Sequence, residues 1–184
     1  MSDGNDNSDK TIEQILKRVE ALETNAPGDK LCLGVMRGDL DYTIAAFIIA
    51  LGAAAYDMQV DLFFTFWATA SLRDPKKRVR KGFLDAMFGW MLPRGTMKLP
   101  LSKMQMAGFG PAMIRKVMKM RGAKSLEELM KEAADFGIRI HVCTMSMDVM
   151  GIKKEELIDY PHMNYVGVGT FVDLFSKAKQ CWFM

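Results

Sequence analysis

One cysteine, Cys143, lies where a strand-like run of residues changes into a helix-like one. The apolar run Ile138-Arg-Ile-His-Val142 precedes it, and Thr144-Met-Ser-Met-Asp148 follows as the start of a helix. A thiol at that position faces the positive end of a helix dipole, which favours the thiolate over the thiol. In α/β proteins the same end of a parallel strand is where ligands bind. Sulfur chemistry at Cys143 is therefore the first hypothesis.

The other cysteines and the nearby histidine are weaker candidates. His141 precedes Cys143 by two residues, so the two side chains share one face of the strand, about 7 Å apart. A charged imidazole there would favour the thiolate, but a neutral ring hydrogen-bonded between sheet and helix is the expected state. Cys32 is expected in a strand core, and Cys181 is expected to pack beside Trp182. The three cysteines form neither a disulfide framework nor a paired zinc motif.

Methionine is abundant enough to raise the question of metal binding. The chain has 17 methionines, and three Met-x-Met pairs match the spacing of thioether sites for Cu(I): Met104-Gln-Met106, Met118-Lys-Met120 and Met145-Ser-Met147. Methionine also fills irregular cores, and no histidine cluster accompanies these pairs. Gly167-Val-Gly169 is too short for a dinucleotide fingerprint. We therefore expect neither a metal nor a cofactor.

Strand and helix patterns alternate along the body of the chain. The expected strands are apolar on both faces and cover residues 30–36, 60–66, 138–143, 163–167 and 180–184. Such a pattern predicts a three-layer α/β/α sandwich with a mainly parallel sheet of about five strands. Residues 30–184 are expected to form one domain. Residues 1–29 are expected to form a disordered head and an amphipathic helix.

Four of the expected strands end in turn and helix-cap residues, and in a parallel sheet those ends lie on one edge. The helix after the first strand can be capped by Asp39 or Asp41. We place the site at this edge, with Cys143 as the reacting residue. Possible contributors to the site are His141, Thr144, Met145, Ser146, Arg37, Thr69 and Thr170.

Positive charge is concentrated in one segment. Residues 68–124 contain fourteen Lys or Arg residues and two acids, a balance of +12 in a chain whose net charge is +3. We interpret residues 67–124 as a basic, methionine-rich helical insertion, a hairpin that covers the sheet edge or a subunit interface. Peripheral membrane contact through residues 76–92 is a less favoured alternative. The signatures of nucleic-acid-binding folds are missing, so no nucleic acid is expected.

Two further expectations concern assembly and location. The apolar segment 83–92 is hard to bury within one small subunit, which predicts a homo-oligomer. The longest apolar run, residues 43–56, is shorter than the ~20 residues that span a bilayer, so no transmembrane segment is expected. The acidic, polar N-terminal residues do not resemble a signal peptide, and unpaired cysteines suit a reducing compartment. We expect the protein to be cytoplasmic.

The run FGIRIHVCTMSMDVMGI, residues 136–152, resembles the DsrE/DsrF/DsrH-like family of sulfur-trafficking proteins. It has the family's strand, a cysteine at the strand end, a short helix and Gly-Ile. Residues 62–67 resemble the family's second strand, and residues 165–174 resemble its closing strand and helix. The insertion and the N-terminal helix depart from short members and resemble a long subgroup sometimes labelled peroxiredoxin-like. No Pro-x-x-x-Thr-x-x-Cys peroxidatic motif supports that label.

The resemblance implies an α/β/α fold, homo- or hetero-oligomers, and sulfane sulfur carried as a persulfide on Cys143. It implies a sulfurtransferase-like carrier that receives sulfur from a rhodanese-like or other persulfide donor and passes it to an acceptor sulfur-carrier protein. Two alternatives stay open. One is a non-catalytic oligomeric binding or assembly module in which Cys143 merely packs, and the other is a thiol redox switch that uses Cys143 with Cys181.

Overall fold

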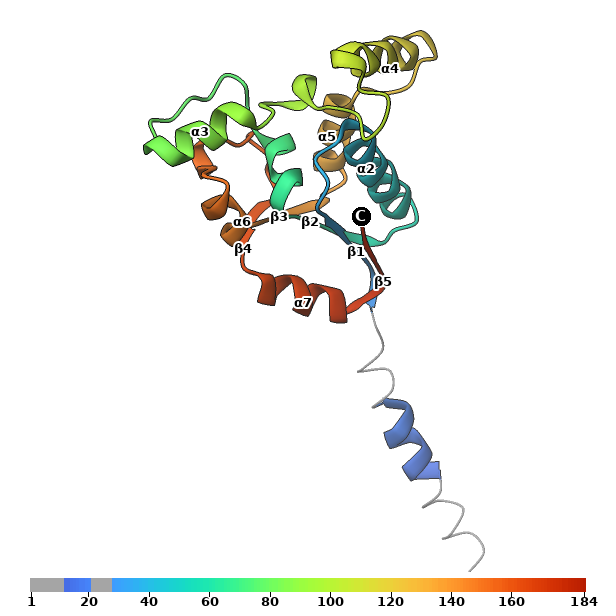
Figure 1. Ribbon diagram of the computed structural model, residues 1–184. Coiled ribbons are helices and arrows are strands. Elements are labelled where there is room, and N and C mark those ends of the chain that lie inside the picture. The colour runs from blue at the N-terminus through green and yellow to red at the C-terminus, as the bar shows by residue number, and fades with distance from the viewer. Residues whose placement is uncertain (1–11, 21–27) are drawn as a thin grey trace, which may run out of the picture.

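Five parallel strands form a single sheet in the computed structural model, which describes residues 12–20 and 28–184 (Figure 1). The order across the sheet is β4-β3-β2-β1-β5. The strands are β1 (Gly28–Val35), β2 (Gln59–Phe64), β3 (Arg139–Cys143), β4 (Met163–Val166) and β5 (Ala178–Phe183). The predicted α/β sandwich is confirmed, and each strand boundary lies within two residues of the expected one.

Helices α2 (Leu40–Ala54) and α5 (Leu126–Asp135) pack together on one face of the sheet. Ala46 and Ala50 of α2 are fully buried, because small side chains let the helix approach the strands closely. Helix α5 starts with the capping box that the sequence predicts: the Ser125 hydroxyl accepts from Glu128 N–H, and the Glu128 carboxylate accepts from Ser125 N–H. Asp39 is the N-cap residue of α2, but its side chain does not cap the helix.

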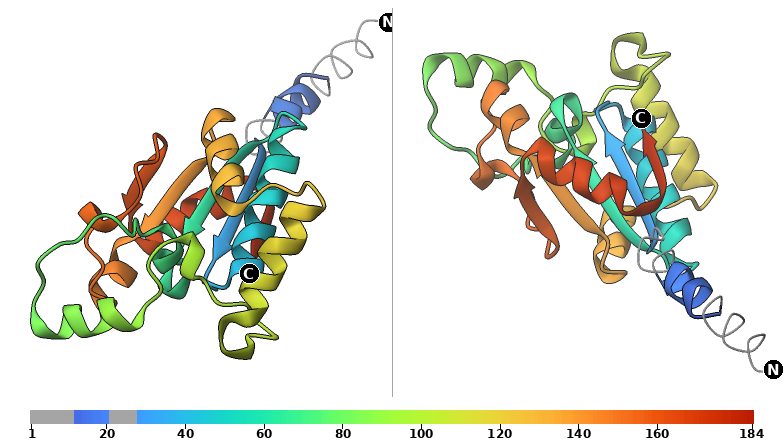
Figure 2. Two further views of the ribbon diagram at one scale, coloured as in Figure 1. Left: turned by 90° about the horizontal axis from the view of Figure 1, so that it is seen from above. Right: turned by 90° about the horizontal axis from the view of Figure 1, so that it is seen from below.

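Among the described residues, one helix, α7 (Val168–Ser176), covers the opposite face of the sheet (Figure 2). Phe171 of α7 stacks on Phe63 of β2, with ring centroids 4.5 Å apart. Phe171 also meets Phe183 of β5 at 6.0 Å. Every residue of α7 is nevertheless half-buried or exposed, so this layer is thin. The buried polar side chains of β2 and β3, Asp61 and His141, lie on this thinly covered face.

The carboxyl edge of the sheet carries the remaining helical elements. Here η1 (Phe66–Leu72) follows β2 and α6 (Thr144–Val149) follows β3. The insertion contributes α3 (Phe83–Met91) and α4 (Phe109–Met120), with the short turns η2 (Thr96–Lys98) and η3 (Met106–Gly108) between them; η4 (Lys154–Glu156) comes after α6.

The expected hairpin in the insertion is wrong, because α3 and α4 lie at opposite ends of this side of the molecule (Figure 1). The loop between them is fixed to the body of the domain. Leu99 is 1% exposed, Pro100 O accepts from Leu40 N–H at 2.7 Å, and Ser102 N–H donates to the Asp41 carboxylate at 3.0 Å. A connection anchored at its middle holds the two helices apart.

A buried ion cluster fastens α3 to the domain. Arg73 is completely buried; it donates to Glu156 Oε2 at 2.9 Å and to Gly89 O at 3.2 Å. Lys81 contributes a second ion pair to Glu156. Burial alone would raise the pKa of Glu156, but hydrogen bonds from Lys81, Lys153 N–H and Arg73 hold that pKa below its usual value. The ionised carboxylate therefore ties η4 to Lys81, just before α3, and to Arg73, which holds Gly89 of α3.

Residues 12–20 form the N-terminal helix that the sequence predicts, and its apolar side chains are largely exposed. The expected disorder of the first residues lies outside the described residues. Within residues 12–20 and 28–184, no helix has the length and apolar character needed to cross a bilayer.

Candidate functional site

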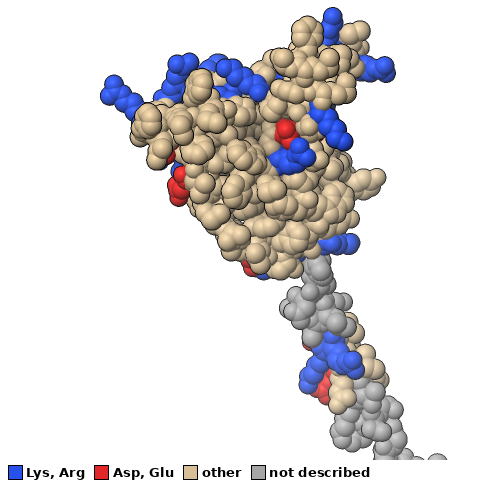
Figure 3. Space-filling view, viewed as in Figure 1, with Lys and Arg blue, Asp and Glu red and all other residues tan. Residues whose placement is uncertain are grey.

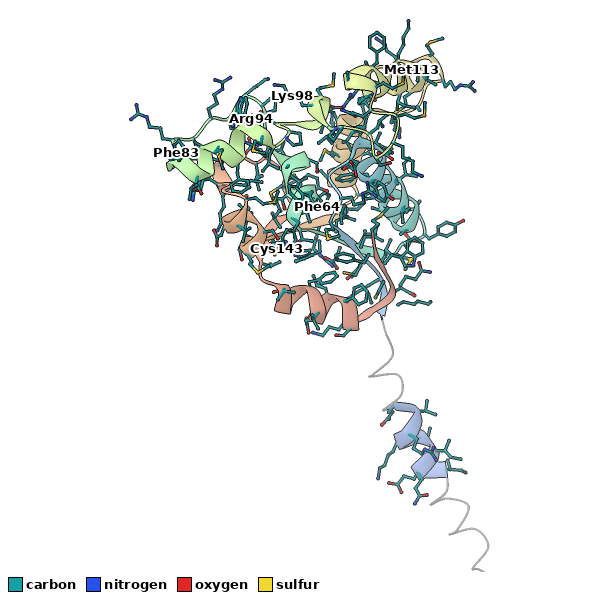
Figure 4. All side chains as sticks on the ribbon, viewed as in Figure 1. Phe64, Phe83, Arg94, Lys98, Met113 and Cys143 are labelled. Carbon is teal, nitrogen blue, oxygen red and sulfur yellow. The ribbon has the colours of Figure 1, made fainter. Side chains whose placement is uncertain are left out.

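Cys143 is both the last residue of β3 and the N-cap residue of α6, as the sequence predicts. Figure 4 labels it where the sheet meets that helix. Its side chain is only 2% exposed. The sulfur thus occupies the expected place at the carboxyl edge, but it is closed off from solvent.

Two hydrogen bonds fix the start of α6 around this cysteine. The Thr144 hydroxyl donates to Val166 O at the end of β4, at 3.3 Å. The Ser146 and Thr65 hydroxyls are 2.7 Å apart, and both side chains are buried. Thr144 and Ser146 are therefore positioned beside Cys143 as expected, whereas Met145 is 53% exposed and points away from the core.

Strand register places Cys143 on the sheet face covered by α7. Phe63, which stacks on α7, is the Cα partner of His141. Neighbouring residues in register share a face, and side chains alternate along each strand. His141 and Cys143 consequently point to the α7 side, as does Asp61, which precedes Phe63 by two residues. The side chains of Ile140 and Val142 point to the α2 and α5 side and are fully buried.

A buried carboxylate orients the histidine next to the cysteine. His141 Nε2 lies 2.7 Å from Asp61 Oδ1, and Arg139 donates from Nε and Nη2 to the same carboxylate at 2.7 and 2.8 Å. Burial alone would raise the pKa of Asp61, but the hydrogen bonds and charges of Arg139 and His141 outweigh it and lower the pKa to about 2. Asp61 is therefore ionised near neutral pH.

An ionised carboxylate can only accept hydrogen bonds, so the proton on the His141 ring sits on Nε2. In the neutral ring, Nδ1 then carries the lone pair. His141 is 6% exposed, and its Nδ1 has no hydrogen-bond partner among the described residues. The predicted hydrogen-bonded histidine between sheet and helix is confirmed. The arrangement leaves one buried, unpartnered basic nitrogen two residues from Cys143.

Sequence reasoning missed Asp61 and Arg139. The available signal was the acid in the middle of the apolar run Val60-Asp-Leu-Phe-Phe64, because an acid in a buried strand must be paired.

The other three predicted contributors come from elements other than β3 and α6. Arg37 follows β1, two strands away from β3, and its Nε donates to Asp39 at 2.9 Å. Thr170 is exposed in the first turn of α7. Thr69 in η1 is fully buried, and its hydroxyl has no hydrogen-bond partner in the described part of the chain. The element that holds Thr69, η1, packs against α6.

The other two cysteines pack as the sequence predicts. Cys32 is 1% exposed, and burial together with the charge of Asp61 raises its pKa to about 12. Cys181 is half-buried, with its thiol 3.0 Å from Phe175 O, and burial raises its pKa.

The sheet order separates Cys143 from Cys181. Two strands lie between β3 and β5, which puts the two cysteines about 14 Å apart across the sheet. A disulfide requires Cα atoms within about 7 Å. A direct Cys143–Cys181 bridge within one chain is therefore incompatible with this fold. Across the described ranges, no three His, Cys, Asp or Glu side chains are grouped so that they could hold a metal ion.

The α/β domain matches a known protein family over nearly its whole length. The DsrE/DsrF/DrsH-like family matches residues 28–183, nearly the whole α/β domain. The chain therefore belongs to this family. The match starts with β1 and includes Cys143 and the entire insertion.

Individual relatives extend this result. The uncharacterized protein YrkE of Bacillus subtilis (strain 168) is 46% identical over 136 residues, which cover 73% of this chain and 84% of YrkE. The sulfur carrier protein DsrE2 of Allochromatium vinosum is 30% identical over 159 residues, which cover 84% of this chain and 98% of DsrE2. Among solved structures, the ychN protein from E. coli matches with a TM-score of 0.47 and 10% identity, over 84% of this chain and 99% of ychN.

Proposed function

We propose that this protein is a sulfur-trafficking protein that holds sulfane sulfur as a persulfide on Cys143. The observation that carries the proposal is the place of Cys143 at the β3–α6 junction, beside a histidine oriented by an ionised carboxylate. Family membership supports a sulfur role, as does similarity to a protein named as a sulfur carrier. The donor would be a rhodanese-like or other persulfide protein, and the acceptor a sulfur-carrier protein.

The transfer needs no metal, cofactor or external oxidant. The Cys143 thiolate attacks the outer sulfur of a donor persulfide, R–S–SH. A new S–S bond forms on Cys143, the donor S–S bond breaks, and the donor leaves as the thiolate R–S⁻. An acceptor thiolate then attacks the outer sulfur on Cys143 in the same way and regenerates the Cys143 thiolate. A well-populated thiolate serves both steps, as nucleophile and as leaving group.

We propose that His141 acts as the general base of this exchange. Nε2–H is committed to Asp61, so Nδ1 is the atom that can take a proton from the thiol, through a bridging water molecule. A proton held there also places a positive charge about 7 Å from Cys143, which favours the thiolate. Replacement of His141 by glutamine should slow sulfur loading, because glutamine has no basic ring nitrogen to take the thiol proton.

Access to Cys143 must come from movement of the layer that covers it. The Cα partner of Cys143 is Val166, and α7 starts two residues after that valine. No residue of α7 is buried, so few contacts hold this helix on the sheet. A Cβ atom added at Gly167 or Gly169 would meet nothing within 4 Å. We infer that the start of α7 moves aside when a donor or acceptor docks.

The direct test is sulfur loading from a persulfide donor. Cys143→Ser keeps the size and polarity of the side chain but cannot hold a persulfide, so it should fold normally and take up no sulfur. Cys181→Ser is the matched control, because Cys181 is the more exposed of the other two cysteines, and it should load normally. Loading of Cys143→Ser at the wild-type rate would refute the assignment and favour the assembly-module alternative. A cytoplasmic location and a homo-oligomeric state stay predictions.

A further inference from the structure

Helix α3 presents its large apolar side chains to solvent, and the face that carries its glycine packs against the protein. Gly89 is its only buried residue, and a Cβ atom at that position would lie 3.3 Å from Lys81 Nζ. Phe83 and Trp90 are 85% and 86% exposed. At 100° per residue, the exposed apolar side chains of α3 fall within about half of the helix circumference. They are Phe83, Leu84, Met87, Phe88, Trp90 and Met91.

Helix α4 carries a second exposed apolar face on the same side of the molecule. Phe109 and Met120 are 78% and 75% exposed, and Met113 and Val117 complete the same face. The view from above in Figure 2 shows α3 and α4 both uncovered. Figure 4 labels Phe83 and Met113 near opposite ends of this side. The two helices lie at opposite ends of the side beyond the carboxyl edge of the sheet, and we call their exposed apolar faces together the α3–α4 platform.

Basic side chains surround this platform. Figure 3 shows Lys and Arg residues gathered over the α3 and α4 side. A groove of about 710 Å³ runs beside α3, and its walls include Trp90 together with Arg78, Arg94 and Lys98. Figure 4 labels Arg94 and Lys98 between the two helices. The acid on α3, Asp85, lies 3.5 Å from Lys153 and does not offset these charges.

Three kinds of occupant can be compared on charge and polarity. A second copy of the chain, docked face to face, would bring two segments of balance +12 together and repel. A nucleic acid would match the charge but leave the apolar side chains of α3 unused. An anionic bilayer satisfies both features, because aromatic and aliphatic side chains enter the boundary between headgroups and acyl chains while Lys and Arg meet lipid phosphates.

We propose that the α3–α4 platform docks this protein onto an anionic membrane surface. Phe83 and Trp90 of α3 enter the interface, and Arg78, Arg80 and Arg94 contact phosphate groups. This contact is peripheral, and it places the groove beside α3 against the headgroups. The proposal does not depend on the sulfur chemistry of Cys143, so either can fail alone.

The test is flotation of the full chain with vesicles of phosphatidylcholine plus phosphatidylglycerol, compared with phosphatidylcholine alone. The wild type should float with the anionic vesicles only, and added salt should weaken the binding. The double variant Phe83→Ser/Trp90→Ser should bind at least about tenfold more weakly. Arg78→Gln/Arg80→Gln should lose on the order of fivefold in affinity for the anionic vesicles for each charge removed.

Two matched controls separate the platform from other exposed apolar residues. Tyr56 follows α2 and is 85% exposed, and Leu16 in the helix of residues 12–20 is 57% exposed. Tyr56→Ser and Leu16→Ser should bind like the wild type. Leu16→Ser could instead weaken vesicle binding as much as Phe83→Ser/Trp90→Ser does. That result would assign binding to the N-terminal helix and overturn the proposal.

Fluorescence locates the contact on the protein. In one variant, Trp90 is kept and Trp67 and Trp182 are replaced by phenylalanine. Its tryptophan emission should shift to shorter wavelength on anionic vesicles, and brominated lipid should quench that emission. A variant that keeps only Trp182, which lies on β5, should not respond. Equal binding to both vesicle types, or no binding, would refute the proposal. Self-association of the wild type without lipid would also refute the proposal if Phe83→Ser/Trp90→Ser abolished it. That result would assign the platform to a second copy of the chain.

Discussion

Replacement of Asp61 by asparagine tests the buried charge cluster behind Cys143. The pKa of Asp61 falls from its ordinary 3.8 to about 2, because its hydrogen bonds with Arg139 and His141 outweigh the effect of burial. At about 1.4 kcal/mol for each pKa unit, the ionised form adds roughly 2 kcal/mol to the free energy of unfolding. Since the folded-state pKa is the lower one, this contribution is complete above about pH 4 and is lost as the pH falls through 2.

Asp61→Asn keeps the shape of the side chain but removes the charge, so it should lower the free energy of unfolding by roughly 2 kcal/mol at pH 7. The difference from the wild type should shrink below about pH 4. Urea unfolding followed by circular dichroism at several pH values measures both effects. Asp173→Asn is the control, because Asp173 is on α7, exposed, and paired only with Lys177. A difference between Asp61→Asn and wild type that stays constant as the pH falls would refute the electrostatic reasoning.

Three further outcomes are expected. Cys32→Ser should lower the free energy of unfolding by about 1–3 kcal/mol, because it buries a hydroxyl in the strand core, whereas Cys181→Ser should change it little; urea titration checks both. Amides of α7 should exchange hydrogen faster than those of α2, since no residue of α7 is buried, and mass-detected exchange would show this. Light scattering should show a homo-oligomer whose contacts lie outside the α3–α4 platform, and a clean monomer across micromolar concentrations would contradict that prediction.

Local patterns in the sequence were enough to place the main elements and the cysteine. The apolar run before Cys143 and the polar residues after it predict the β3–α6 junction, and Ser125 with Glu128 predicts the start of α5. Each of these signals is carried by residues close together in the chain.

The features that sequence reasoning missed depend on contacts between distant segments. Asp61 meets Arg139 across 78 residues of sequence, and only the register of β2 on β3 brings them together. Arg73 and Glu156 are 83 residues apart. The insertion is not a hairpin because its middle is anchored at Leu99 and Ser102, and neither residue type signals such an anchor. The burial of Cys143 likewise follows from how α7 crosses the sheet.

The most direct test of the central claim is a peptide-level mass map of the wild-type protein after reaction with a persulfide donor and again after addition of an acceptor thiol. The proposed function predicts that the peptide containing Cys143 gains the mass of one sulfur atom in the first step and loses it in the second, while the peptides of Cys32 and Cys181 stay unchanged. Added sulfur on Cys181 alone, or no added sulfur on Cys143, would contradict it.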